Sequence, residues 1–174
     1  MQRRRLPFRF GWLFVGLALA FNGEAEAATA TANLNVSCSI SSTCTITTVA
    51  LAFGAYDPVV TNASTPLTGT GTVRVTCTSG ASTTVTLGQG TYANTGSSDT
   101  VPLRRMRDSG TNYLSYYLYQ DASYTTVWGN TAPTGVGHTG SGSITNLTVY
   151  GRVTQAQNVP SGSYSDVVVA TITF

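Results

Sequence analysis

Polar and apolar side chains alternate strictly through residues 33–41 of this chain. Successive side chains of a β-strand point to opposite faces, so this pattern predicts a strand with one polar and one apolar face. The apolar face would carry Leu34, Val36, Cys38 and Ile40. A period of two does not produce the apolar stripe of a helix, so the segment indicates a β protein.

A second alternating segment occupies residues 164–174. Its apolar positions Val168, Ala170, Ile172 and Phe174 share one predicted face. Val167 and Val169 make the other face apolar as well, so we expect this strand to be central or well covered. A predicted strand near each end of the sequence raises the question of what each one pairs with.

The first 27 residues have the pattern of a secretion signal. Arginines at positions 3, 4, 5 and 9 precede an apolar run over residues 11–21, and Ala25 and Ala27 form a small-x-small cleavage site. The apolar run of about 11 residues is well short of the roughly 20 needed to span a bilayer. We therefore predict a cleaved signal at residues 1–27, with no stable membrane insertion after its removal.

The rest of the chain is rich in Thr, Ser, Val, Tyr and Gly, which favour strands and turns. Short strands at regular spacing, separated by turn residues, are typical of a β-sandwich. Residues 129–143, rich in Gly, Thr and Ser, are expected to form a loop. We expect strands at residues 33–41, 44–53, 71–78, 83–88, 100–107, 112–120, 124–128, 144–153 and 164–174.

The charge balance argues against a nucleic-acid partner. Removal of the signal leaves five arginines and five aspartates, a net charge of zero. Charged residues make up 9% of the whole chain, against about 25% in typical domains. Near-zero net charge promotes association, which fits a protein that assembles.

The sequence offers little catalytic or metal-binding chemistry. His138 is the only histidine and lies in the Gly-rich loop, and no nucleophile-elbow motif is present. The three cysteines lack the short spacing of a metal site. The one basic cluster, residues 104–107, is interpreted as a strand with one face in solvent. We predict no enzyme activity, no cofactor and no metal.

Six spaced motifs resemble the spore coat protein U family, which includes Csu-type pilins of the archaic chaperone–usher pathway. The resemblance covers nearly all of the chain after the signal. The motifs lie at residues 53–58, 73–78, 104–106, 114–129, 149–152 and 159–166.

The resemblance implies an incomplete immunoglobulin-like β-sandwich that lacks its last strand. Residues 44–174 would form the domain, and residues 28–43 would form a donor-strand segment. In that family a periplasmic chaperone lends a strand, and at the outer-membrane usher the N-terminal strand of the next subunit replaces it. Here Leu34, Val36, Cys38 and Ile40 would be the plugs, and the strand carrying Val168, Ala170, Ile172 and Phe174 would edge the groove and contact the chaperone.

The implied function is that of a structural pilus subunit for adhesion and biofilm formation. Its partners would be the chaperone, the usher, and identical or sister pilin subunits. It would pass through the periplasm of a Gram-negative bacterium to the cell surface. Two alternatives stay open: residues 33–41 could pair within their own domain, and the protein could be a self-contained exported coat or surface-binding protein.

Three cysteines in an exported chain leave one over. The family pattern places a cysteine just before the strand that ends in Phe-Gly, which implies a disulfide between Cys44 and Cys77. Cys38 would then be a small apolar plug. A bridge between Cys38 and Cys77, or one between molecules, is the alternative.

Overall fold

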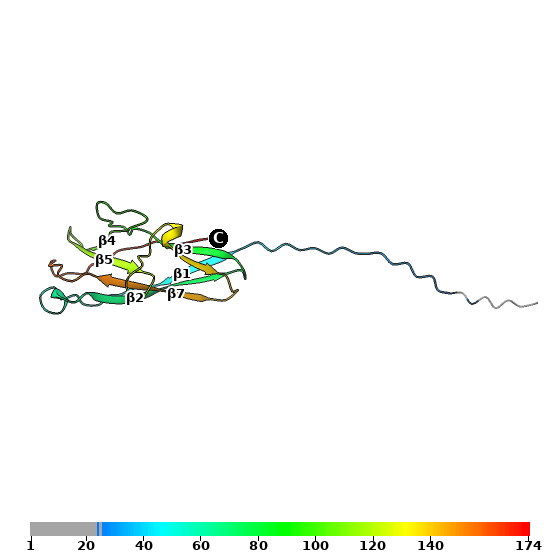
Figure 1. Ribbon diagram of the computed structural model, residues 1–174, viewed down its shortest axis with the longest axis horizontal. Coiled ribbons are helices and arrows are strands. Elements are labelled where there is room, and N and C mark those ends of the chain that lie inside the picture. Colours follow the sequence, from blue (N-terminus) through cyan, green and yellow to red (C-terminus); the bar gives the residue numbers. More distant parts are fainter. Residues whose placement is uncertain (1–23, 25) are drawn as a thin grey trace, which may run out of the picture. The chain divides into compact units, whose positions relative to one another are not determined.

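The computed structural model describes residue 24 and residues 26–174, so nearly all of the predicted signal lies outside the described residues. The chain divides into two units, Met1–Cys38 and Ser39–Phe174. Residues 26–38 are assigned to no helix or strand, and they run as an extended segment (Figure 1). Leu34 and Val36 are 87% and 85% exposed. The strand expected at 33–41 therefore does not form within this chain, although the sequence still gives the segment one polar and one apolar face.

The second unit is a two-sheet β-sandwich (Figure 1). Two short 3-10 turns, Thr61–Ala63 and Ala132–Thr134, lie between strands. The strands are Cys44–Val49 (β1), Leu67–Cys77 (β2), Ser82–Leu87 (β3), Arg104–Arg107 (β4), Tyr113–Tyr119 (β5), Val136–Thr139 (β6), Thr145–Val153 (β7) and Ala170–Thr173 (β8).

The larger sheet has the order β1-β2-β7-β5-β4, and the smaller one has the order β6-β3-β8. All pairings are antiparallel. The first and last strands of the described sandwich are therefore both edge strands. β1 and β8 also contact each other, so the two sheet edges meet on one side of the sandwich.

The inner faces of the two sheets carry the alternating apolar residues that the sequence predicts. Trp128 closes the core, and its indole N–H donates to the Val85 carbonyl at 2.9 Å. Each fully buried side chain of this kind contributes about 1.5–3 kcal/mol. The buried cluster consists of Val73, Val75, Val85, Leu87, Leu114, Tyr116, Leu118, Trp128, Val149 and Val153.

One strand prediction and one loop prediction are wrong in the middle of the chain. Residues 124–128 form only an isolated bridge between Val127 and Tyr119, because Asp121 holds a turn by accepting bonds from the backbone of Thr125 and Thr126. The predicted loop at 129–143 contains β6, which pairs with β3 although it includes Gly137.

The prediction for the C-terminal strand is also wrong in two respects. The hydrogen-bonded strand is only Ala170–Thr173, and it lies at the edge of its sheet rather than at the centre. Val167 and Val169 are 69% and 66% exposed. Within the described chain β8 pairs with β3 alone, and the second apolar face of the segment before it lies in solvent.

The predicted disulfide between Cys44 and Cys77 is confirmed. The two cysteines lie directly opposite each other in the ladder of β1 and β2. A cross-link over 33 residues stabilises a domain by about 3–4 kcal/mol in the chain-entropy model. The alternative bridge from Cys38 to Cys77 is thereby wrong, and Cys38 is exposed.

Candidate functional site: an open apolar groove

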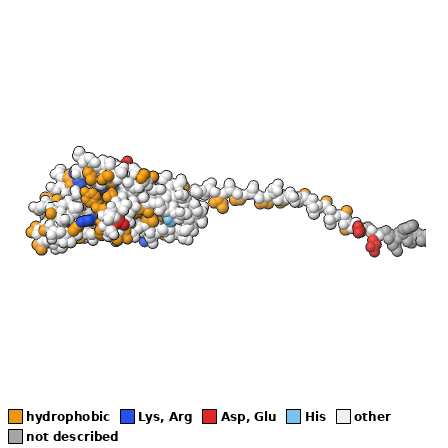
Figure 2. All heavy atoms as spheres, in the orientation of Figure 1, with side chains coloured by type: hydrophobic (Ala, Val, Ile, Leu, Met, Phe, Trp, Pro, Cys, Tyr) orange, Lys and Arg blue, Asp and Glu red, His pale blue; other side chains and the backbone are white. Residues whose placement is uncertain are grey.

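A groove of about 1010 Å³ opens along the side of the sandwich where β1 and β8 meet. One wall comes from residues 48–58, which follow and include the end of β1, and the other from residues 159–170, which lead into β8. Figure 2 shows hydrophobic side chains gathered on the visible face of the folded domain. The floor is the buried core itself, with Leu114, Leu118 and Val153 among its residues.

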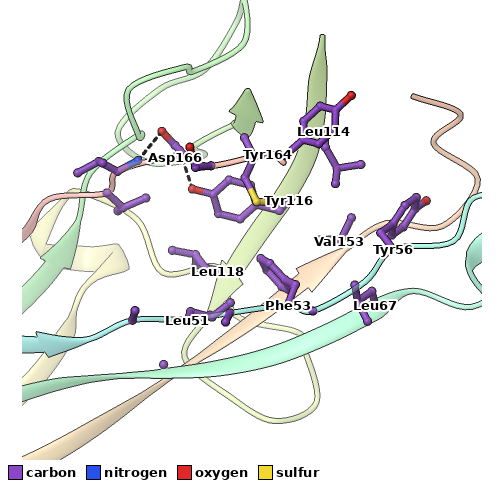
Figure 3. Close-up of a pocket in the computed structure, with 18 of the residues that line it drawn as sticks. Leu51, Phe53, Tyr56, Leu67, Leu114, Tyr116, Leu118, Val153, Tyr164 and Asp166 are labelled. Atoms are coloured by element: carbon purple, nitrogen blue, oxygen red, sulfur yellow. Dashed lines mark hydrogen bonds between the residues drawn. The ribbon is translucent and has the colours of Figure 1, made fainter. Parts of the chain in front are cut away.

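The first wall forms because the chain leaves the sheet after β1. We expected a strand over 44–53, but β1 ends at Val49. Leu51 and Phe53 then pack against the core (Figure 3). Two glycines make room for them: a Cβ on Gly71 would lie 2.9 Å from the Leu51 Cβ, and one on Gly151 would lie 2.7 Å from the Phe53 Cζ.

We expect Gly71→Ala to push Leu51 away from the groove wall and to lower the free energy of unfolding by about 1–3 kcal/mol, the usual effect of overpacking. The added Cβ would also lie 3.1 Å from the Val49 carbonyl oxygen, which cannot move as freely as a side chain. Gly137→Ala is the matched control, since its Cβ would meet nothing within 4 Å. Chemical denaturation of the two variants measures the difference, and equal midpoints would contradict this packing.

The second wall is held in place by hydrogen bonds to the carboxylate of Asp166, which we call the Asp166 latch. Its carboxylate accepts bonds from the Tyr116 hydroxyl at 2.7 Å and from the Thr91 amide at 2.8 Å. Arg107 and Ser165 exchange two backbone hydrogen bonds beside it. Figure 3 shows Asp166 and Tyr164 across the groove from Leu51 and Phe53, with Tyr116 and Leu118 between them. The wall is thus held in place although it pairs with no full strand.

Arg104 lies buried behind this wall. The interpretation of residues 104–107 as a strand with one face in solvent is confirmed, since Arg105 and Arg107 lie on the outer face, but the sequence did not indicate that an arginine would occupy the inner face. Only 1% of Arg104 is exposed, and its guanidinium donates to the carbonyls of Leu87, Gly88 and Trp128 at 2.7–2.8 Å. Burial lowers the pKa of Arg104 to about 10, against the opposing effects of Tyr116 and Asp166. The side chain is still charged at neutral pH and ties three segments together, namely its own strand β4, residues 87–88 and Trp128.

The groove is suited to binding rather than to catalysis. Its lining is mainly aliphatic and aromatic, and His138 lies on β6 outside the lining residues. Burial, followed by the bond to Asp166, raises the pKa of Tyr116, so its hydroxyl stays neutral. No group of three or more metal-ligating side chains occurs among the described residues. Nor does that part of the chain contain a helix long and apolar enough to cross a membrane.

The residues predicted for the site fall in three places. Val168 and Ala170 line the groove, and Ile172 packs against the core beside them. Phe174 is 57% exposed. The predicted plugs Leu34, Val36, Cys38 and Ile40 are exposed in the extended N-terminal stretch, and their role stays a prediction.

Sequence reasoning missed the wall residues Leu51 and Phe53, the glycines beneath them and the latch at Asp166. One feature of the sequence could have indicated the close approach of this wall to the sheet. Gly71 and Gly151 occupy positions on strands where the alternation calls for an apolar side chain, and such a glycine often marks a close approach of another segment.

The fold and its open edge define an immunoglobulin-like β-sandwich of the pilin type. A family model for the Spore Coat Protein U domain matches residues 30–171, and the chain belongs to that family. The resemblance drawn from the six sequence motifs is thereby confirmed. The family and the fold are those of structural proteins rather than of enzymes.

One similar protein supports this assignment by its sequence, and one solved structure shares the fold. Protein U of Myxococcus xanthus is 52% identical over 127 residues, which cover 71% of each chain. A similar fold occurs in the crystal structure of the CsuC–CsuE chaperone–tip adhesion subunit pre-assembly complex from archaic chaperone–usher Csu pili of Acinetobacter baumannii. That match has a TM-score of 0.54 and 18% identity, and it covers 78% of this chain but 40% of the solved chain. At this identity the likeness concerns the fold.

Proposed function

We propose that this protein is a structural subunit of a chaperone–usher surface pilus that polymerises by donor-strand complementation. The observation that carries the proposal is the apolar groove between residues 48–58 and 159–170, open where both sheets end. An open sheet edge above an exposed core is a template for strand addition. A strand from another molecule would complete the backbone ladder and cover the groove at once.

The N-terminal segment has the properties of the strand that the groove needs. In residues 28–43 the plugs Leu34, Val36, Cys38 and Ile40 alternate with polar residues, so one face could enter an apolar groove while the other stays in water. Four buried plugs give an upper bound of about 6–12 kcal/mol before ordering costs. That stabilisation is sufficient for a long-lived fibre.

The proposal assigns the parts of the chain and their partners. Residues 1–27 direct export and are removed, and residues 44–174 form the pilin domain. A periplasmic chaperone covers the groove in transit, an outer-membrane usher exchanges the chaperone for the next subunit, and the assembled pilus serves adhesion and biofilm formation. The solved complex of a chaperone with a subunit of this fold supports the chaperone as a partner.

A second candidate is a self-contained exported coat or surface-binding protein. The family's description as spore coat and the 52% identity to Protein U favour it. It differs physically from the first candidate in one respect: the domain would be stable without a strand from another molecule.

Deletion of residues 28–41 behind an intact signal separates the two candidates. Co-expressed with the cognate chaperone, the truncated subunit should still be captured, because the groove is intact. It should not be added behind another subunit, because it has no strand to donate. Pull-down of the chaperone and electron microscopy of surface fibres measure the two steps.

The full-length subunit, produced beside the deletion under the same conditions, is the control. A truncated protein that accumulates as a stable folded monomer without the chaperone would support the coat protein and overturn the pilus proposal.

A further inference from the structure

The outer face of the larger sheet carries all the arginines of the described chain that are not buried. Arg74 lies on β2, Arg105 and Arg107 on β4, and Arg152 on β7. The neighbours of these arginines along the strands pack on the core side, so alternation places the four arginines on the opposite face. These neighbours are Val73, Val75, Met106 and Val153. The five strands contain no acidic residue at all. The strands of this face therefore carry only positive charges, although Asp108 and Asp121 lie in the turns that follow β4 and β5.

Tyrosines lie among these arginines. Rings from β5, β7 and two loops form two groups in which neighbouring ring centroids lie 5.6–6.5 Å apart: Tyr92 with Tyr113, and Tyr117, Tyr119, Tyr124 and Tyr150. Arg105 lies 4.1 Å above the ring of Tyr113, and Arg152 lies 5.9 Å from that of Tyr124. We call this surface the tyrosine–arginine face. It consists of Tyr92, Tyr113, Tyr117, Tyr119, Tyr124, Tyr150, Arg105, Arg107 and Arg152.

Tyr124 is held on this face in an unfavourable backbone conformation. Its φ is 56°, in the left-handed region that costs a side-chain-bearing residue roughly 1–2 kcal/mol. Asp121 accepts bonds from the amides of Ser123, Thr125 and Thr126 and so fixes the turn. The result is a ring set edge-on between Tyr119 and Tyr150, outside the core. Strain that places an aromatic ring on a surface is typical of a binding site.

Arg152 is partly exposed, so a ligand could reach the outer nitrogens of its guanidinium, although its Nε is not accessible. Its Nε is buried and has no hydrogen-bond partner, and its contact with Tyr124 is with a ring. Tyr117 and Thr68 lie opposite it on the two neighbouring strands, and neither is acidic. A small cavity of about 230 Å³, walled in part by Tyr150 and Gln120, adjoins the same ring cluster.

A second copy of this chain is a poor match for the tyrosine–arginine face. Each aspartate of the domain already accepts hydrogen bonds within its own chain, mostly in turns: Asp57, Asp99, Asp108, Asp121 and Asp166. These carboxylates already hold their own turns and loops in place, so they are less available to pair with the arginines of another copy. An anionic partner of another kind fits better.

We propose that the tyrosine–arginine face binds an anionic polysaccharide. Guanidinium groups form paired hydrogen bonds with carboxylates, and tyrosine rings offer flat apolar surfaces against which the C–H face of a sugar ring packs. Arginines on β4 and β7, on either side of β5, suit a linear chain with repeated charges. The groove lies on the core side of the sandwich, so polysaccharide binding goes beyond the proposed assembly and does not compete with it.

The test uses the full chain, exported and processed together with its assembly partners, and alginate, a polyuronate, as the probe. Binding is measured by biolayer interferometry at an ionic strength of about 0.15 M, where weak surface attraction is screened. We expect binding to alginate and none to neutral dextran. Arg152→Gln should weaken the Kd about tenfold by removing a charge-assisted pair. Tyr124→Ala should weaken it too, whereas Tyr124→Phe, which keeps the ring, should not.

Arg74→Gln is the matched control. It removes the same charge from the same sheet face, but among the described residues Arg74 lies over no aromatic ring. We expect a change of no more than about twofold, as for an isolated surface charge. Equal losses for Arg74→Gln and Arg152→Gln would overturn the proposal in favour of net charge alone. Tighter binding to duplex DNA or to phosphatidylglycerol vesicles than to alginate would overturn the choice of ligand class, and no binding to alginate would overturn the site.

Discussion

Val36→Asp is expected to abolish polymerisation of the subunit while leaving its own domain folded. Val36 is 85% exposed in the extended segment, so the change alters no packing within the chain. On the proposed function its side chain enters the groove of the next molecule. An unpaired carboxylate there would lie among Leu118, Val153 and other apolar side chains, which carries a penalty of several kcal/mol. Fibre yield on the cell surface and the amount of chaperone complex are the two readouts.

Ser37→Asp is the matched control for Val36→Asp. It adds the same charge one residue later, on the face that alternation directs to water. We expect fibres from Ser37→Asp at near the unchanged yield and none from Val36→Asp, with both captured by the chaperone. Loss of fibres in both variants would mean that any added charge in the segment blocks assembly, whichever face of the strand carries it. That result would contradict the assignment of Val36 as a plug.

Arg104→Met is expected to lower the free energy of unfolding by about 5 kcal/mol, since each buried carbonyl left without a donor costs about 1–3 kcal/mol. The guanidinium holds the carbonyls of Leu87, Gly88 and Trp128 together beneath the groove wall. Methionine fills much of the volume but donates no hydrogen bond. Chemical denaturation of the processed protein gives the value.

Arg105→Met provides the comparison for this prediction. Arg105 also donates to two carbonyls, those of Tyr92 and Ala93, but it is partly exposed, so water can replace it. We expect a loss of about 1 kcal/mol, the usual net value of such bonds. If the two variants were equally stable, the buried arginine would not be the element that ties the three segments together.

The sequence predicted the sandwich because alternation is a local property. Inward and outward positions alternate along strands such as β2, β5 and β7, and the inner residues Val73, Leu114 and Val149 are buried as expected. The prediction failed where the decisive contacts are distant. Arg104 looks like a surface cation in sequence, and only the folded chain brings three carbonyls to it.

The groove could be predicted only in part. The family resemblance placed its edge at the C-terminal strand, and Val168 and Ala170 do line it. The other wall depends on the departure of the chain from β1 after Val49, and alternation continues through Leu51 and Phe53 as if the strand did too. Val167 and Val169 led to a wrong prediction, because a strand that is apolar on both faces is usually central in its sheet. Both side chains are exposed in this chain, as expected if another molecule covers them.

The most direct test of strand donation between molecules is a photo-cross-link from position 36. A photoreactive amino acid replaces Val36, and isotope-labelled and unlabelled subunits are assembled together in the presence of their chaperone and usher. Mass spectrometry should find cross-links that join labelled to unlabelled peptides and that end in residues 48–58 or 159–170. Cross-links confined to peptides of the same isotope, within one chain, would contradict the account.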